Sequence, residues 1–209
     1  MSSHGRLGEV TLERLRRLSD HSLRKASNSM TSLLGLPVRL TTTRVALVPL
    51  ADLPSLAVEA DSSPMAGLRI HITGEASGQI VILFPQHTVF HLLGVLLGKR
   101  EERGPLSSEE QSAIQEVGNI LASAFLSGLG DLLRRRLMLT PPQIHLDDVL
   151  GLMARVATEM GGEGSEVLMV QAMFEDPEER VEGRIFVLPE MTSLAALLEG
   201  GDAHWESEA

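Results

Sequence analysis

The most informative segment of this chain of 209 residues is Leu106-Ser-Ser-Glu-Glu-Gln-Ser-Ala-Ile-Gln-Glu-Val-Gly-Asn-Ile-Leu-Ala-Ser-Ala-Phe-Leu-Ser-Gly-Leu-Gly-Asp-Leu-Leu133. Pro105 precedes two serines, Ser107 and Ser108, either of which can act as the N-cap. Acidic and amide side chains follow in the first turn, where carboxylates favour the helix dipole. We therefore predict a helix from about Ser108 to Leu133.

This helix is predicted to have one polar and one apolar face. Because successive residues are turned by about 100°, Ser112, Glu116, Asn119 and Ser123 fall in one narrow stripe. The apolar side chains of the segment, such as Phe125, point the opposite way, toward a core. On periodicity alone, a solvated helix face is the more usual explanation of such a stripe.

Apolar periodicity and turn-forming residues predict the helices, strands and turns in the rest of the chain. A second long helix is predicted over 12–34, ended by Gly35-Leu-Pro37, and shorter helices are predicted over 87–97 and 192–198. Turns are predicted at 74–78, 161–164 and 175–180. Strand-like stretches are 38–50, 68–73, 80–84, residues from Ile144 onward, 167–174 and 183–189.

The two halves of the chain repeat the same order of elements. An offset of 99 places Leu132-Leu133 on Leu33-Leu34, and the offset drifts to about 104 where Gly183 to Pro189 falls on Gly78 to Pro85. A chance hydrophobic match is the alternative explanation. We predict a single domain over 1–209, made of repeats at about 10–100 and 106–200. Its fold class is α/β (α+β), internally duplicated with pseudo-two-fold symmetry, with a shared, antiparallel-rich sheet flanked by long helices.

Composition and charge exclude several classes of function. Eighteen basic against 28 acidic residues give a formal net charge of −10, which argues against nucleic acid as a partner. The absence of cysteine excludes disulfides, thiolate zinc sites and cysteine nucleophiles. Because no stretch approaches the ~20 apolar residues of a membrane span, we expect no such span and a cytoplasmic protein.

Glu116 and Asn119 together suit chemistry that is completed by another macromolecule. A carboxylate and a carboxamide three residues apart on a helix can reach the same external point. The motif contains no nucleophile, no histidine and no metal-ligand cluster, so a reactive group and any cation would come from the partner. An amide can hold a water in line with a phosphoryl group without adding negative charge beside it.

The spacing Ser112-x3-Glu116-x2-Asn119-x22-Pro142, within Glu116-Val-Gly-Asn-Ile120, resembles the signature of the CheC family of chemotaxis phosphatases, with the related CheX and FliY proteins. The resemblance extends over nearly the whole chain. It includes the two-copy layout, Leu33-Leu-Gly-Leu-Pro-Val38, Gly78 to Pro85, Pro141-Pro142 and Gly183 to Pro189.

This resemblance implies hydrolysis of the aspartyl phosphate of a CheY-like response regulator. In the family's mechanism the asparagine, here Asn119, orients the attacking water, and the glutamate, here Glu116, pairs with a lysine of the regulator. Ser112 and Pro142 match motif positions that support the helix and loop geometry. The regulator supplies the phospho-aspartate and Mg²⁺, so no cofactor or metal site of the chain's own is expected.

The first repeat departs from this motif. The offset of 99 puts Glu13, Arg17, Asp20 and Thr43 at the positions of Ser112, Glu116, Asn119 and Pro142. Arg17 reverses the charge that should pair with a lysine, and Asp20 would place a carboxylate beside a phosphoryl group. We expect this copy to be inactive as a phosphatase.

Other functions remain as alternatives. The resemblance also allows a non-catalytic interaction module that binds a CheD-like deamidase or a flagellar switch component. A distant third is a metal hydrolase using His87 and His91, whose spacing of four can chelate zinc, although Thr88 stands where a catalytic glutamate would be. The run Arg134-Arg-Arg136 complements the helix dipole and could also steer an acidic partner.

Overall fold

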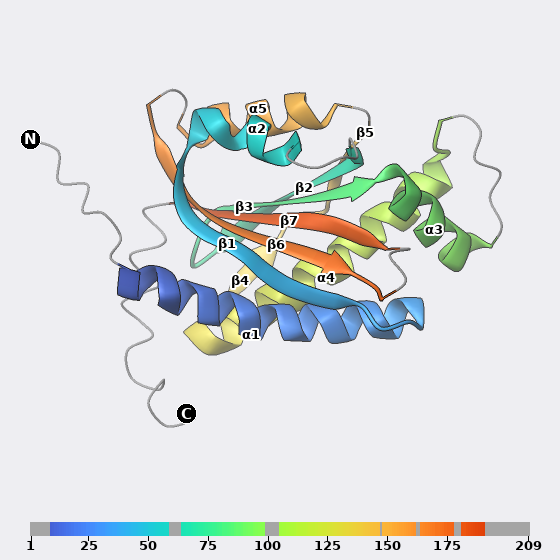
Figure 1. Ribbon diagram of the computed structural model, residues 1–209, viewed down its shortest axis with the longest axis horizontal. Helices are drawn as coiled ribbons and strands as arrows, with labels where there is room; N and C mark the ends of the chain where they lie inside the picture. The colour runs from blue at the N-terminus through green and yellow to red at the C-terminus, as the bar shows by residue number, and fades with distance from the viewer. Residues whose placement is uncertain are drawn as a thin grey trace, which may run out of the picture.

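An antiparallel β-sheet forms the centre of the fold in the computed structural model (Figure 1). The structure describes residues 9–58, 64–98, 105–146, 148–161, 164–177 and 181–190. Within them, seven strands join in the order β1-β6-β7-β3-β2-β4, with β5 also paired to β2, and all the pairings are antiparallel. The strands are β1 (Arg39–Pro49), β2 (Pro64–Gly74), β3 (Gly78–Pro85), β4 (Leu137–Leu139), β5 (Gln143–Leu146), β6 (Glu166–Glu175) and β7 (Glu182–Pro189).

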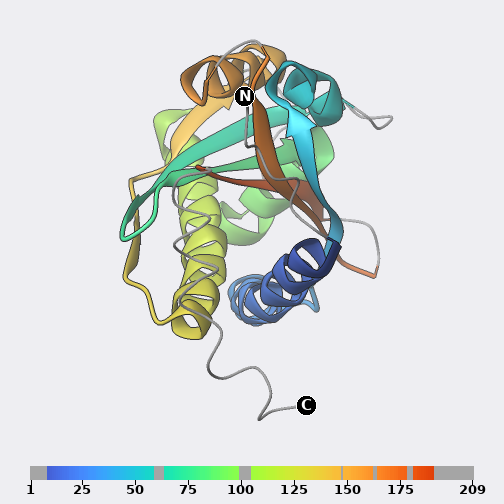
Figure 2. The same ribbon diagram turned by 90° about the vertical axis from the view of Figure 1, so that its left-hand side faces the viewer.

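Helices cover both faces of this sheet, so that the molecule has three layers (Figure 2). The long helices α1 (Glu9–Leu34) and α4 (Ser108–Leu133) lie side by side on one face, with α3 (Gln86–Leu97) against α4. The shorter helices α2 (Leu53–Val58) and α5 (Val149–Glu159) cover the other face, and a 3₁₀ turn, η1 (Leu50–Asp52), leads into α2. The predicted fold class, α/β (α+β) with an antiparallel sheet flanked by long helices, is thereby confirmed.

The central strand β3 shows why the sheet is apolar on both faces. Ile80, Ile82 and Phe84 belong to the core cluster under α1, α3 and α4, whereas Val81 and Leu83 belong to the cluster under α2 and α5. Side chains alternate between the faces of a strand, so a strand covered on both sides needs apolar residues at every position. The uninterrupted apolar run of β3 is the sequence signature of this central place.

Helix α4 begins with a complete capping box. The Ser107 hydroxyl accepts a hydrogen bond from the Glu110 backbone N–H at 3.3 Å, and the Glu110 carboxylate accepts one from the Ser107 N–H at 2.7 Å. Both interactions satisfy backbone donors that a helix N-terminus leaves unpaired. Ser107, one of the two predicted N-caps, is therefore the cap.

Most predicted elements are present, but the stretch after Leu146 was predicted wrongly. Residues read as strand-like from Ile144 up to the loop at 161 form only the short β5 and then the helix α5, whose N-cap Asp148 accepts a hydrogen bond from the Gly151 N–H at 3.0 Å. Helix α2 and strand β4 were also missed. The helix predicted over 192–198 lies outside the described residues.

The internal repeat stays a prediction. The elements from α1 to α3 and those from α4 to β7 both begin with a helix of 26 residues that packs on the same face of the sheet.

None of the helices in the described ranges combines the length and apolar character needed to cross a membrane.

Candidate active site

The polar stripe of α4 faces away from the core. Ser112 and Glu116 are exposed and Asn119 is half-buried, whereas Ile114 and Val117 on the opposite side of the helix are buried. A separation of three residues on a helix brings Glu116 and Asn119 together on one face. The stripe predicted from periodicity therefore exists as a rigid, accessible surface.

Pro142 lies beside this stripe, although 23 positions separate it from Asn119 in the chain. Gln115 of α4 donates a hydrogen bond from its side-chain amide to the Pro142 carbonyl at 2.7 Å. The four motif residues and their neighbours line one surface pocket: Ser112, Gln115, Glu116, Asn119, Leu139, Thr140, Pro141 and Pro142. The structure thus brings together all four residues that the sequence singled out.

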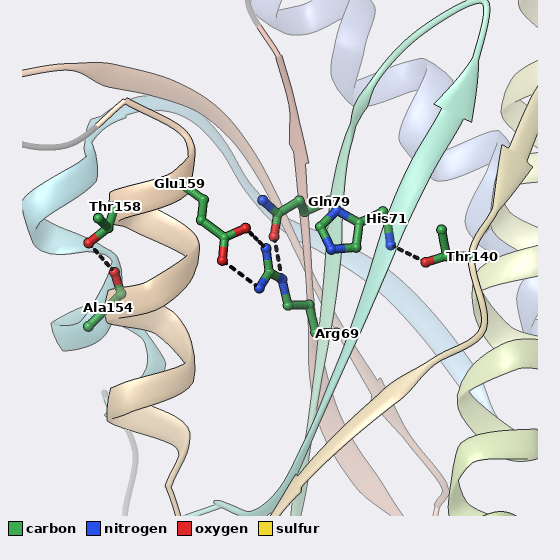
Figure 3. Close-up of polar contacts among 7 residues, drawn as sticks. All are labelled: Arg69, His71, Gln79, Thr140, Ala154, Thr158 and Glu159. Atoms are coloured by element: carbon green, nitrogen blue, oxygen red, sulfur yellow. Dashed lines mark hydrogen bonds and ion pairs between the residues drawn. The ribbon is translucent and has the colours of Figure 1, made fainter.

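A second contact joins the proline loop to the sheet. The backbone N–H of His71 on β2 donates to the Thr140 hydroxyl at 3.0 Å (Figure 3). The Thr140 N–H in turn donates to the His71 carbonyl at 3.0 Å. This pair of bonds lies between the segment of β2 that pairs with β4 and the segment that pairs with β5. Thr140 and Gln115 therefore hold the loop from two sides.

Sequence reasoning missed Gln115 and Thr140 as members of the site. Gln115 looks like any polar side chain on an exposed helix, and Thr140 like any loop residue. The partner of each is a backbone group that is distant in sequence, so no local pattern indicates the contact. The one available signal was their position immediately beside the motif residues Glu116 and Pro142.

Behind β2, a buried arginine ties the strand to α5. Arg69 is 6% exposed and donates to the Gln79 side-chain oxygen at 2.8 Å and, through both terminal nitrogens, to the carboxylate of Glu159 (Figure 3). The hydrogen bonds from Arg69 to Glu159 lower the pKa of that carboxyl below its ordinary value of 4.5. The ion pair anchors the strand that carries the His71 contact.

A histidine of β5 lies close to the same cluster. Burial lowers the pKa of His145 below its ordinary value of 6.5, and the positive charges of Arg155 and Arg69 lower it further. An Arg155 guanidinium nitrogen lies 3.3 Å from His145 Nδ1. The neutral imidazole is therefore the favoured form on this strand, which begins directly after Pro142.

The corresponding face of the first repeat has a different chemistry. Arg17 is exposed and its Nε lies 3.4 Å from the Glu13 carboxylate. Thr43 sits at an irregularity in the pairing of β1 with β6 and donates a hydrogen bond from its hydroxyl to the Gln171 carbonyl at 3.2 Å. A positive group thus stands at the position that the predicted repeat aligns with Glu116.

The two histidines of α3, His87 and His91, do not lie in a cluster of potential metal ligands among the residues that the structure describes. His87 Nε2 lies 3.5 Å from the Glu182 carboxylate, and the Nε2 atom of His91 is buried without a hydrogen-bond partner in the described part of the chain. Among the residues that the structure describes, no three His, Asp or Glu side chains gather as potential metal ligands.

Comparison with known proteins gives three consistent results. Residues 109–146 match the model of the CheC-like family, a range that contains all four motif residues. The CheY-P phosphatase CheC of Bacillus subtilis is 23% identical over 94% of this chain and 96% of its own length. CheC1 of Halobacterium salinarum is 22% identical over 90% of this chain and 94% of its own length.

Solved structures show that the fold is shared. FliY of Thermotoga maritima superposes with a TM-score of 0.74 at 14% identity, covering 93% of this chain and 96% of its own. FliM from a FliM–SpeE complex of H. pylori gives a TM-score of 0.71 at 12% identity, with 95% and 100% coverage. CheX of Desulfovibrio desulfuricans gives 0.53 at 12% identity, with 83% and 99% coverage. The matched segment, the relatives that align over nearly the whole chain and the shared fold all make this chain similar to proteins of the CheC family.

Proposed function

We propose that this protein is a phosphatase that hydrolyses the aspartyl phosphate of a CheY-like response regulator. The observation that carries the proposal is the joint presentation of Glu116 and Asn119 in one accessible pocket with Ser112 and Pro142. The names of the relatives support the same activity, since the CheC protein of B. subtilis is a CheY-P phosphatase.

Asn119 orients the attacking water in this proposal. Its side-chain amide can accept a hydrogen bond from the water and hold the oxygen in line with the phosphorus atom. The water oxygen then bonds to phosphorus, and the bond from phosphorus to the aspartyl oxygen breaks. The products are a free aspartate carboxylate, inorganic phosphate and a proton that passes to solvent. Because the amide is neutral, it does not repel the phosphoryl oxygens.

Glu116 positions the regulator by pairing with a lysine of the regulator's own site. The carboxylate is exposed on the rigid helix α4, so it can reach a cation on a docked surface. Ser112 and Pro142 support the shape of the pocket, and the Gln115 side chain fixes the proline loop against the helix. The regulator contributes the phospho-aspartate and its own Mg²⁺, which would complete a site that is incomplete in this chain.

The experiment is the decay of a phosphorylated CheY-like receiver domain from the same organism, alone and with the protein. We expect the wild-type protein to accelerate decay and Asn119→Ala to lose about 10²-fold of that acceleration, the scale expected when a reacting group loses its positioning. Asp20→Ala is the matched control, because Asp20 holds the corresponding place on α1 and should leave the rate unchanged.

Equal acceleration by wild type and Asn119→Ala would contradict this site. No acceleration of any CheY-like receiver from the organism would favour the second candidate, a non-catalytic interaction module. The likeness in fold to FliM is the observation behind that candidate. A pull-down that recovers a CheD-like deamidase or a flagellar switch protein, without phosphatase activity, would support it.

A further inference from the structure

The surface beside the candidate site continues along α4 to the end of that helix. A second hollow adjoins the first and shares Asn119 and Leu139 with it. It runs past Ser123 to the segment from Arg134 to Met138, where the chain turns from α4 into β4. A partner placed over Asn119 would therefore extend over this segment.

The far end of this hollow has a positive charge. Arg134 and Arg136 are exposed, and the backbone N–H of Arg136 donates a hydrogen bond to the Glu75 carboxylate at 2.6 Å. The acidic residue lining the hollow, Asp131, is already paired with Lys25 of α1 at 2.9 Å. The local charge is thus opposite in sign to the formal net charge of −10 of the whole chain.

An apolar side chain stands beside these arginines. Met138 is 61% exposed, the most exposed large apolar side chain among the described residues. Methionine is flexible and polarizable, which suits a contact surface that adapts to a partner. A basic rim next to an exposed apolar group is typical of a protein interface.

We propose that Arg134, Arg136 and Met138 form a docking subsite for an acidic segment of the phosphorylated receiver, next to its phosphoryl group. This proposal rests on the proposed function. A surface that binds a phosphoryl group and the oxygen ligands of Mg²⁺ is rich in negative charge, and a chain of net charge −10 would otherwise repel it. Two arginines at one end of the hollow attract and orient such a surface.

The test compares two double variants that each remove two positive charges. Arg134→Asn/Arg136→Gln changes the subsite, and asparagine suits the left-handed backbone of position 134, where φ is 51°. Arg39→Gln/Arg44→Gln is the control, because both arginines are exposed on β1, at the opposite edge of the sheet from β4. Thermal melting of all variants verifies that they fold.

We expect the subsite variant to raise the KM for the phosphorylated receiver about tenfold with little change in kcat, as steering by charge predicts. Its catalytic efficiency should also depend less on salt than that of the wild type. Met138→Ala should raise KM without changing the salt dependence, whereas Met173→Ala, on β6, should have no effect. The proposal would be overturned if both double variants raised KM equally, or if the subsite variant left KM unchanged.

A binding measurement distinguishes two outcomes: that the docking subsite is wrong, and that the proposed phosphatase activity is wrong. The receiver is activated with beryllofluoride, which mimics its phosphoryl group and is not hydrolysed, and its affinity is measured for each variant. If the wild type binds but does not accelerate decay, the phosphatase proposal fails, and weaker binding by the subsite variant still supports docking. If the wild type accelerates decay and the subsite variant binds equally well, the docking proposal alone fails.

Discussion

Gly118 of α4 lies directly against Leu68 of β2. A Cβ atom at position 118 would be 2.1 Å from Leu68 Cδ1, far inside van der Waals contact, and Leu68 is fully buried. The helix backbone therefore sits closer to the sheet here than any other residue would allow. Because Glu116 and Asn119 flank this contact on the outer side of the helix, it sets their distance from the sheet and from the proline loop.

Gly118→Ala should destabilise the protein by about 1–3 kcal/mol, the usual cost of overpacking a core. This loss should appear although alanine favours a helix by up to about 1 kcal/mol over glycine. Gly94→Ala in α3 is the control, because nothing lies within 4 Å of a Cβ there. Urea unfolding of both variants measures the difference, and equal stability of the two would contradict the close packing.

Glu116→Lys should lower the catalytic efficiency of receiver dephosphorylation by about tenfold or more, since close charge pairs at interfaces are worth ~1.5 kcal/mol or above. The substitution sets two like charges against each other if a regulator lysine docks there. Glu109→Lys, an exposed carboxylate in the first turn of the same helix, is the charge-matched control. The pairing role would be untenable if both variants dephosphorylated the receiver at the same rate.

Glu159→Gln should lower stability at neutral pH and lose this effect in acid. The pKa of Glu159 is lowered in the folded protein, first by its hydrogen bond to Arg69, so its contribution is present above the ordinary value of 4.5. It disappears as the pH falls through the folded pKa. Half of the carboxylate side chain is exposed, so we expect about 1 kcal/mol or less after solvent screening.

Urea midpoints at a series of pH values measure this effect, with Glu166→Gln, an exposed carboxylate on β6, as the control. The wild type and Glu159→Gln should converge as the solution is acidified. A constant difference between them at every pH would show that packing, rather than charge, explains the loss.

His145→Gln should make the free energy of unfolding fall less than that of the wild type when the pH is lowered from neutral to mildly acidic values. Burial lowers the pKa of His145 below 6.5, so the unfolded chain binds the proton more tightly than the folded one. Stability from this group is present above 6.5 and is lost as the pH falls from there through the folded pKa. His21→Gln, an exposed histidine of α1, is the control, and identical pH profiles for the wild type and His145→Gln would contradict the inference.

Several elements could be predicted because their signals are local. The apolar run Ile80–Phe84 predicted a strand, and the two candidate caps, Ser107 and Ser108, predicted a helix that starts at about Ser108. Helix α5 was missed because the strand-like reading that begins at Ile144 was carried past Asp147 and Asp148, although these two acidic residues interrupt the apolar pattern. The Asp148 carboxylate caps this helix by accepting a hydrogen bond from the Gly151 N–H. An aspartate followed closely by a glycine is also common in turns, so these residues alone do not identify a helix start.

The sequence by itself determined which residues share the outer face of α4, because residues three positions apart, such as Glu116 and Asn119, lie on the same side of a helix with 3.6 residues per turn. It also predicts that, if the chain is an internal repeat, Arg17 and Asp20 depart from the motif in the first copy. Only the tertiary structure decided that Pro142 lines the same pocket as Asn119, because the Gln115 and Thr140 side chains hold the proline loop through hydrogen bonds with backbone groups far along the chain. Likewise, Arg134 and Met138 become neighbours of the pocket only because the chain folds back from α4 into β4, which no helical or strand period encodes.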